Sequence, residues 1–95
     1  MDKPVLKYFS HQRCNVCKVL KPKVQQMLTE KFPKMSFEYV DIEEQPAVAA
    51  ENQVFTVPTL LIFFEGKEYY RFARNVSLGQ LIDAIERPYQ MLFES

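Results

Sequence analysis

The sequence predicts an α/β protein with a four-stranded mixed sheet and helices on both of its faces. Two observations lead to this fold class. A strand-like run at residues 5–10 passes directly into helical spacing over residues 15–31. Residues 58–64 are apolar at nearly every position, which is typical of a central strand that is buried on both faces. With 95 residues, the chain is expected to form a single domain over residues 1–95.

The first strand and the first helix are predicted from local patterns. Residues 5–10 are mostly β-branched, aromatic and aliphatic, and apolar residues keep helical spacing from Val16 to Phe32. Pro22 lies inside this helix and is expected to kink it, because proline removes one backbone donor and clashes one turn back. Pro33 is expected to end the helix.

The next two elements are a strand at residues 35–42 and a short helix at residues 46–51. Phe37 and Tyr39 alternate with polar residues, which predicts a strand with unequal faces. Pro46 is well placed at the first turn of the short helix. A right-handed crossover from the first strand makes the first two strands parallel.

The last part of the chain predicts a β-hairpin followed by a helix. Residues 58–64, a turn at residues 65–66 and a returning strand at residues 67–73 form the hairpin. Ser77 and Gln80 have the spacing of a capping box before an apolar helical stripe. Pro88 is expected to break that helix and leave residues 89–93 as a separate turn, giving the order β-α-β-α-β-β-α.

Charge and composition argue against several classes of protein. The chain has 12 Lys and Arg residues and 12 Asp and Glu residues. It therefore lacks the basic excess that is typical of nucleic-acid-binding proteins. Glycine occurs only at positions 66 and 79, which excludes Gly-rich phosphate loops. The longest uncharged apolar stretch, residues 57–64, is far shorter than the roughly 20 residues of a membrane helix. Lys7 interrupts the first apolar run, so we expect no secretory signal, no membrane association and a cytoplasmic location.

The two cysteines form the segment Cys14-Asn15-Val16-Cys17. A structural disulfide across so short a loop constrains little of the unfolded chain, and a zinc site needs four ligands where only His11 is available to join the pair. A redox dithiol is the leading interpretation, with buried structural thiols and metal or cluster ligands as alternatives. We expect no bound cofactor or metal, because the cysteines themselves carry the two electrons.

With this dithiol at a strand-to-helix junction, the chain resembles the thioredoxin family. The segments that carry the resemblance are Phe9-Ser10, Cys14-Asn15-Val16-Cys17-Lys18 with Pro22, residues 40–46, and Val57-Pro58-Thr59-Leu60-Leu61 with Phe63 and Gly66. The resemblance implies a thioredoxin fold without that family's extra N-terminal strand. It also implies a thiol–disulfide oxidoreductase that acts on protein disulfides and receives electrons from a reductase or from glutathione.

The cysteines have different expected roles. Cys14 lies at the predicted helix start, where backbone N–H groups and the helix dipole favour a thiolate nucleophile. Cys17 follows almost one turn later and is expected to resolve the mixed disulfide. Pro58 resembles the family's cis-proline, and the resemblance implies that Val57 beside it pairs with an extended substrate strand.

Three departures from the family's pattern bear on the site. Arg13 stands where thioredoxins usually have tryptophan, and Arg74 stands where a glycine usually follows the last strand. With Lys18, these cations predict a positive rim that supports the Cys14 thiolate and binds acidic substrates. Tyr8 stands where thioredoxins usually have a buried acid. Because a tyrosine is a poor base at neutral pH, we interpret Tyr8 as a core aromatic that supports the site.

Two other functions and one mode of assembly remain open at this stage. The chain is alternatively a partner-binding module with a dormant dithiol, or a protein that holds an iron–sulfur cluster with external glutathione. The strand at residues 35–42 is expected at a sheet edge. Its aromatic residues then either form a weak homodimer through that edge or fold back onto a helix.

Overall fold

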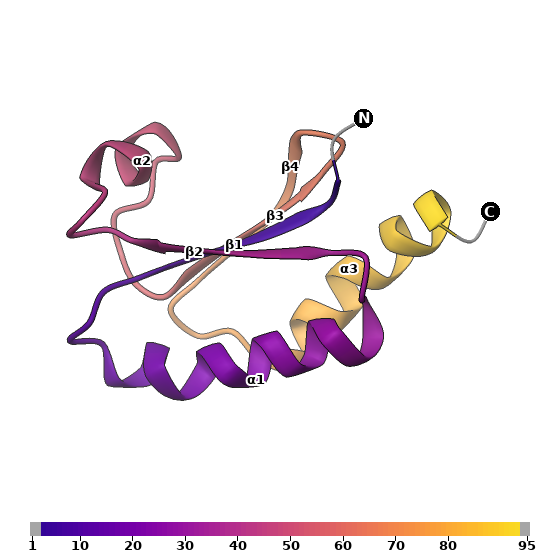
Figure 1. Cartoon of the computed structure of the whole chain (residues 1–95), viewed down its shortest axis with the longest axis horizontal. Helices are drawn as coiled ribbons and strands as arrows, with labels where there is room; N and C mark the ends of the chain where they lie inside the picture. The colour runs from indigo at the N-terminus through magenta and orange to yellow at the C-terminus, as the bar shows by residue number, and fades with distance from the viewer. Residues whose placement is uncertain (1–2, 94–95) are drawn as a thin grey trace.

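The computed structural model describes residues 3–93 and shows a four-stranded mixed sheet with the strand order β2-β1-β3-β4 (Figure 1). The predicted fold class and order of elements are confirmed. The elements are β1 (Val5–Ser10), α1 (Asn15–Lys31), β2 (Ser36–Asp41), α2 (Pro46–Glu51), β3 (Thr59–Phe64), β4 (Lys67–Ala73) and α3 (Leu78–Phe93).

Strand pairing follows the predicted crossover and hairpin. β1 pairs with β2 in parallel and with β3 antiparallel, and β3 pairs antiparallel with β4. The turn between β3 and β4 is made by Glu65 and Gly66, both with positive φ. The register places Tyr8 of β1 between Tyr39 of β2 and Leu60 of β3, so Tyr8 lies in the interior of the sheet.

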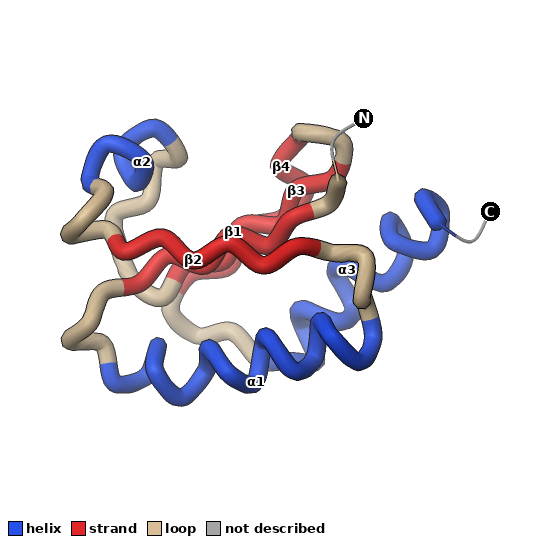
Figure 2. The backbone as a smooth tube through the Cα atoms, viewed as in Figure 1, coloured by secondary structure: helices blue, strands red, loops and turns tan. Residues whose placement is uncertain are grey.

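Helices cover the sheet on both faces, as Figure 2 shows: α1 and α3 lie below it in this view, and α2 lies above its end. Successive side chains of a strand point to opposite faces, so β3 contributes to two cores. Leu60 and Ile62 pack in the cluster formed with α1 and α3, whereas Leu61 packs with Phe9 and Ala49 beneath α2. This explains why the sequence of β3 is apolar on both faces.

The expectation that Pro88 ends the last helix is wrong, because α3 continues through it to Phe93. Proline costs about 3 kcal/mol in a helix interior, and the residues beyond it make contacts that offset this cost. Tyr89 is buried, its ring lies 5.0 Å from that of Phe32, and its hydroxyl oxygen accepts a hydrogen bond from the backbone N–H of Lys34 at 3.1 Å. Tertiary packing therefore overrides the local signal.

The predicted end of α1 and the predicted start of α3 agree with the structure. α1 extends unbroken through Pro22, and Phe32 follows its last residue as the C-cap, so Pro33 lies just beyond the helix. Before α3, the capping box is confirmed: Gln80 N–H donates to Ser77 Oγ at 3.1 Å, and Ser77 N–H donates to Gln80 Oε1 at 2.9 Å. Among the residues described, no helix combines the length and the apolar character that spanning a membrane requires.

β2 lies at one edge of the sheet, as predicted, and its aromatic residues face α1. Phe37 is half-buried against the core cluster of α1 and α3. The ammonium group of Lys21, on α1, lies 4.3 Å from the centre of the Tyr39 ring. Phe37 therefore folds back onto a helix, whereas Tyr39 contacts Lys21 of α1 and is still 38% exposed. The alternative arrangement, a weak homodimer through this edge, stays a prediction.

Candidate redox site

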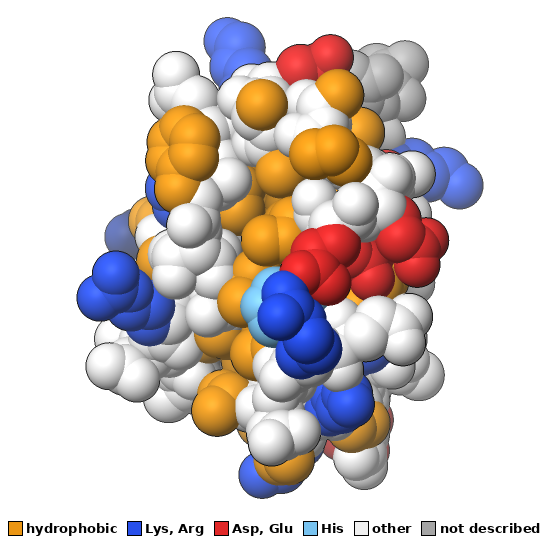
Figure 3. Space-filling model, turned by 90° about the vertical axis from the view of Figure 1, so that its left-hand side faces the viewer, with side chains coloured by type: hydrophobic (Ala, Val, Ile, Leu, Met, Phe, Trp, Pro, Cys, Tyr) orange, Lys and Arg blue, Asp and Glu red, His pale blue; other side chains and the backbone are white. Residues whose placement is uncertain are grey.

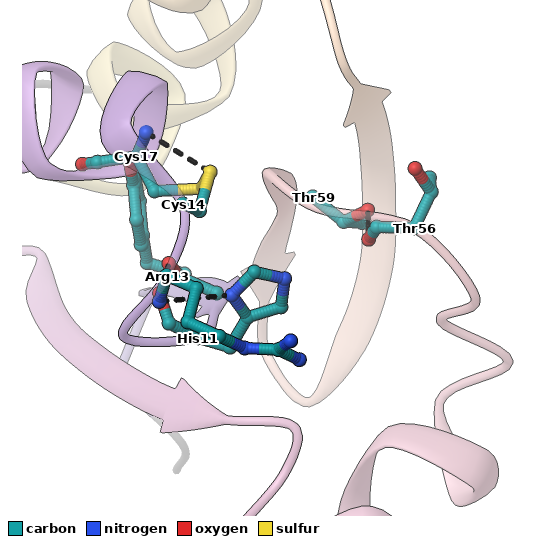
Figure 4. The surroundings of a disulfide bond; sticks show 8 residues. His11, Arg13, Cys14, Cys17, Thr56 and Thr59 are labelled. Atoms are coloured by element: carbon teal, nitrogen blue, oxygen red, sulfur yellow. Dashed lines mark hydrogen bonds between the residues drawn. A yellow bond between two sulfur atoms is a disulfide. The ribbon is translucent and has the colours of Figure 1, made fainter.

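Cys14 lies at the N-cap of α1, in the connection that follows β1. Its backbone is extended, and Cys17 N–H donates to Cys14 Sγ at 3.2 Å (Figure 4). The two residues are joined by a disulfide, with their Cα atoms 5.2 Å apart. The helix dipole and this N–H group both favour negative charge on the Cys14 sulfur once the pair is reduced.

The two sulfur-bearing side chains differ in accessibility. Cys14 is half-buried, whereas only 1% of Cys17 is exposed. Cys17 belongs to the buried side of α1, which consists of residues 17, 24, 27 and 28, and it lies in the same core cluster as Leu6 and Tyr8 of β1. A disulfide that approaches from solvent therefore contacts Cys14 before Cys17.

The loop that precedes β3 lies opposite the disulfide in Figure 4. The Val57–Pro58 peptide bond is cis, Pro58 is buried, and Val57 and Cys14 pack against the same core cluster. Thr59 hydroxyl donates to the backbone carbonyl of Thr56 at 2.7 Å, which closes this loop. The structure thus brings together the cysteine pair and the Val57–Pro58 segment, far apart in sequence.

Arg74 is joined to the same loop from the end of β4. Its backbone N–H donates to the carbonyl oxygen of Pro58 at 2.8 Å. Its φ of 66° falls in the left-handed region, where an ordinary residue is disfavoured and glycine is not. This backbone conformation suits the glycine that the family resemblance implies at this position, where this chain has an exposed cation instead.

Tyr8 is fully buried below the site, so its interpretation as a core aromatic is confirmed. Its hydroxyl donates to the carbonyl oxygen of Cys17 at 2.8 Å, and its ring lies 5.8 Å from Phe37 and 6.2 Å from Tyr39, centre to centre. Burial, with a smaller contribution from Tyr39, raises the pKa of Tyr8 to about 12. Tyr8 therefore stays protonated at neutral pH and takes no proton from Cys17.

The three cations of the predicted rim occupy different settings. Arg13 is exposed and forms an ion pair with Glu43, in the turn after β2. Lys18 is exposed on α1, and Arg74 lies across the site beside the start of that helix. Figure 3 shows the face that carries His11, where basic side chains lie directly beside acidic ones. The glutamate balances part of the predicted positive charge.

Two cavities, neither of them predicted from the sequence, flank the first turns of α1. A groove of about 680 Å³ runs between α1 and the β4–α3 connection. Val16 and Val19, 63% and 60% exposed, line it, so Val16 is not the core residue that its helical spacing suggested. A smaller cavity of about 180 Å³ lies on the other side and reaches Cys17. Exposed valines on a helix otherwise rich in polar residues are the signal that would have located the groove.

His11 makes a local contact only: its Nδ1 atom accepts a hydrogen bond from the backbone N–H of Arg13 at 3.2 Å. Within residues 3–93, no three His, Cys, Asp or Glu side chains come close enough together to hold a metal ion.

Comparison with known proteins agrees with this geometry. A family model described as Thioredoxin matches residues 1–87. The thioredoxin-like protein YdfQ of Bacillus subtilis is 34% identical over 84 residues, which cover 88% of this chain and 74% of that protein. Thioredoxin-1 of Saccharomyces cerevisiae is 37% identical over 67 residues, covering 70% of this chain and 64% of the yeast protein. The structure of thioredoxin 1 from Thermosipho africanus superposes with a TM-score of 0.84 at 36% identity, covering 93% of this chain and 97% of that one.

Proposed function

The chain belongs to the thioredoxin family and is a thiol–disulfide oxidoreductase, and we propose that it reduces disulfides of other proteins with Cys14 as nucleophile and Cys17 as resolving thiol. One observation carries this assignment. The pair is joined across the first turn of α1, with one cysteine accessible and the other enclosed.

The exchange has two steps. The Cys14 thiolate attacks one sulfur of the substrate disulfide, which forms a mixed disulfide and releases the first substrate sulfur as a thiolate that takes up a proton. The Cys17 thiolate then attacks Cys14 Sγ, which breaks the mixed disulfide, forms the Cys14–Cys17 disulfide and releases the second substrate thiol. Two electrons from a reductase or from glutathione restore the dithiol. A reducing compartment such as the cytoplasm suits this cycle.

Substrate is proposed to bind in an extended form across the accessible cysteine. Backbone groups of Val57, beside the buried Pro58, pair with the substrate strand, and an apolar substrate side chain enters the groove beside Val16. Arg74 lines that groove, and Arg13 directly precedes Cys14 in the sequence. Both positive charges favour acidic groups near the substrate disulfide. Pairing of two β2 edges into a weak homodimer stays a prediction.

Reduction of insulin by dithiothreitol tests the proposed function. The protein should accelerate insulin precipitation catalytically, and Cys14→Ala should abolish the acceleration, because the variant has no accessible thiolate. Absence of acceleration by the wild-type protein would favour the partner-binding module with a dormant dithiol. A purified protein with the colour of an iron–sulfur cluster would favour cluster binding.

Arg74→Gly is expected to weaken reduction of acidic substrates selectively. Glycine suits the left-handed backbone at this position, so the fold is retained while the charge is removed. For a disulfide peptide with acidic residues next to its cysteine, kcat/KM at low salt should fall roughly two- to fivefold, the size of an exposed charge interaction. The same kinetics on a matched neutral peptide provide the control. An equal fall for both peptides would show that Arg74 does not select for charge.

A further inference from the structure

The smaller cavity gives Cys17 a polar environment on the side away from Cys14. Cys17 lines it together with residues from β1, the loop after β1, β2 and α1; these are Ser10, His11, Gln12, Lys18, Lys21 and Tyr39. Most of the residues that line this cavity are polar, and Cys17, itself only 1% exposed, is among them. Neither the two-step exchange nor the substrate groove uses it.

The titratable groups around Cys17 include no carboxylate among the residues that line the cavity. From β1 comes Tyr8, which is bonded to the Cys17 carbonyl and stays protonated. β2 contributes Tyr39, the loop after β1 contributes His11, and α1 contributes two lysines. The loop at residues 52–58 contains no charged residue. Asp41 of β2 is buried next to Ser10 in the sheet, but it does not line the cavity, and its carboxylate accepts hydrogen bonds from the backbone N–H groups of Glu43 and Glu44. Among the residues that line the cavity, Cys17 therefore has cationic neighbours and no carboxylate.

Of the two lysines that line the cavity, Lys21 is better placed to influence the charge of the Cys17 sulfur. It lies four residues after Cys17, on the same side of α1. Its ammonium group is held 4.3 Å from the centre of the Tyr39 ring, and the residue is half-buried, whereas Lys18 is exposed and more strongly screened by solvent. Within residues 3–93, no carboxylate forms an ion pair with Lys21.

We propose that Lys21 is a positioning residue for the resolving step: its charge favours the Cys17 thiolate, and the thiol proton leaves to solvent through the cavity. This proposal rests on the proposed function. In the second step Cys17 loses its proton to water, its sulfur bonds to Cys14 Sγ, and the substrate sulfur departs and takes a proton from water. A nearby positive charge promotes this deprotonation because it stabilises the Cys17 thiolate, and water rather than a side chain accepts the proton.

Direct titration of Cys17 tests the role of Lys21. In a Cys14→Ser background, the ¹³C shift of the Cys17 β-carbon follows ionisation of that single thiol. Lys21→Gln should raise the midpoint by roughly half a pH unit or more, the effect of losing a neighbouring opposite charge. Lys21→Arg, which keeps the charge, should leave the midpoint near its original value. Lys31→Gln removes a lysine from the far end of the same helix and should change nothing.

Single-turnover kinetics then separate the inference from the proposed function. Reduced protein with intact cysteines reacts with 5,5′-dithiobis(2-nitrobenzoate), and each attack releases one coloured thiolate. Lys21→Gln should leave the first release unchanged and slow the second about threefold near neutral pH, the loss of thiolate that a half-unit shift produces. Unchanged titration and unchanged second release in folded Lys21→Gln would overturn the role of Lys21. Absence of the first release in the wild-type protein would instead overturn the proposed function.

Discussion

Cys17→Ser is expected to convert the protein into a trap for its substrates. Cys14 keeps its place at the N-cap of α1 and still attacks, but no second thiol lies within reach of the mixed disulfide. Without added thiol, release of the second substrate sulfur should slow by at least about 1,000-fold, because an intramolecular attack has become a bimolecular one. Mass spectrometry of the reaction with a disulfide peptide should show a stable adduct of protein plus one peptide thiol.

Cys14→Ser is the matched variant for this experiment. The remaining thiol, Cys17, is 1% exposed, so folded Cys14→Ser should form little or no adduct with the same peptide. The two variants differ in one sulfur each, and Tyr8 and the cavity are retained in both. Adducts on Cys14→Ser and none on Cys17→Ser would reverse the two roles and with them the proposed path of the substrate.

Much of the fold is predictable because its elements carry local signals. The apolar run of β3 predicts burial on both faces, and the structure places Leu60 and Leu61 in different cores. The crossover rule predicts parallel β1 and β2, and the capping box at Ser77 predicts the start of α3. The end of α3 depends on Tyr89 packing against Phe32, 57 positions earlier, so a rule about Pro88 alone predicts it wrongly.

The site, like the fold, has features that the sequence predicts and features that depend on tertiary structure. The spacing of Cys14 and Cys17 at a strand-to-helix junction identifies the redox pair from sequence. The hydrogen bond from Tyr8 to Cys17 depends on how β1 packs against α1, and the position of Lys21 depends on Tyr39, in a different element. The ion pair of Arg13 with Glu43 spans 30 positions. These contacts depend on tertiary structure, so residue pattern alone identifies the chemistry of the site but not the groups that adjust it.

Tyr8→Ala is expected to lower the free energy of unfolding by about 4 kcal/mol, the usual cost of removing a large buried aromatic side chain. The ring is fully buried between β2 and β3 and touches the aromatic residues Phe37 and Tyr39. Tyr8→Phe keeps the ring and removes only the hydrogen bond to the Cys17 carbonyl, so its cost at neutral pH should be about 1 kcal/mol. Urea unfolding followed by circular dichroism measures both values.

The alkaline range isolates the hydroxyl group of Tyr8. Its pKa is about 12 in the folded protein and about 10 in the unfolded chain, so the unfolded state loses this proton first as pH rises. The stability that Tyr8 contributes is therefore fully present below pH 10 and is lost between about pH 10 and pH 12. Tyr8→Phe lacks this titration, and the other tyrosines titrate in both proteins and cancel in the difference. The stability difference between wild type and Tyr8→Phe should therefore shrink from pH 8 to pH 11. A difference that stays constant would mean that the hydroxyl group ionises as readily in the folded protein as in the unfolded chain, and a difference that grows would mean that it ionises more readily in the folded protein; either result would contradict a pKa raised by burial.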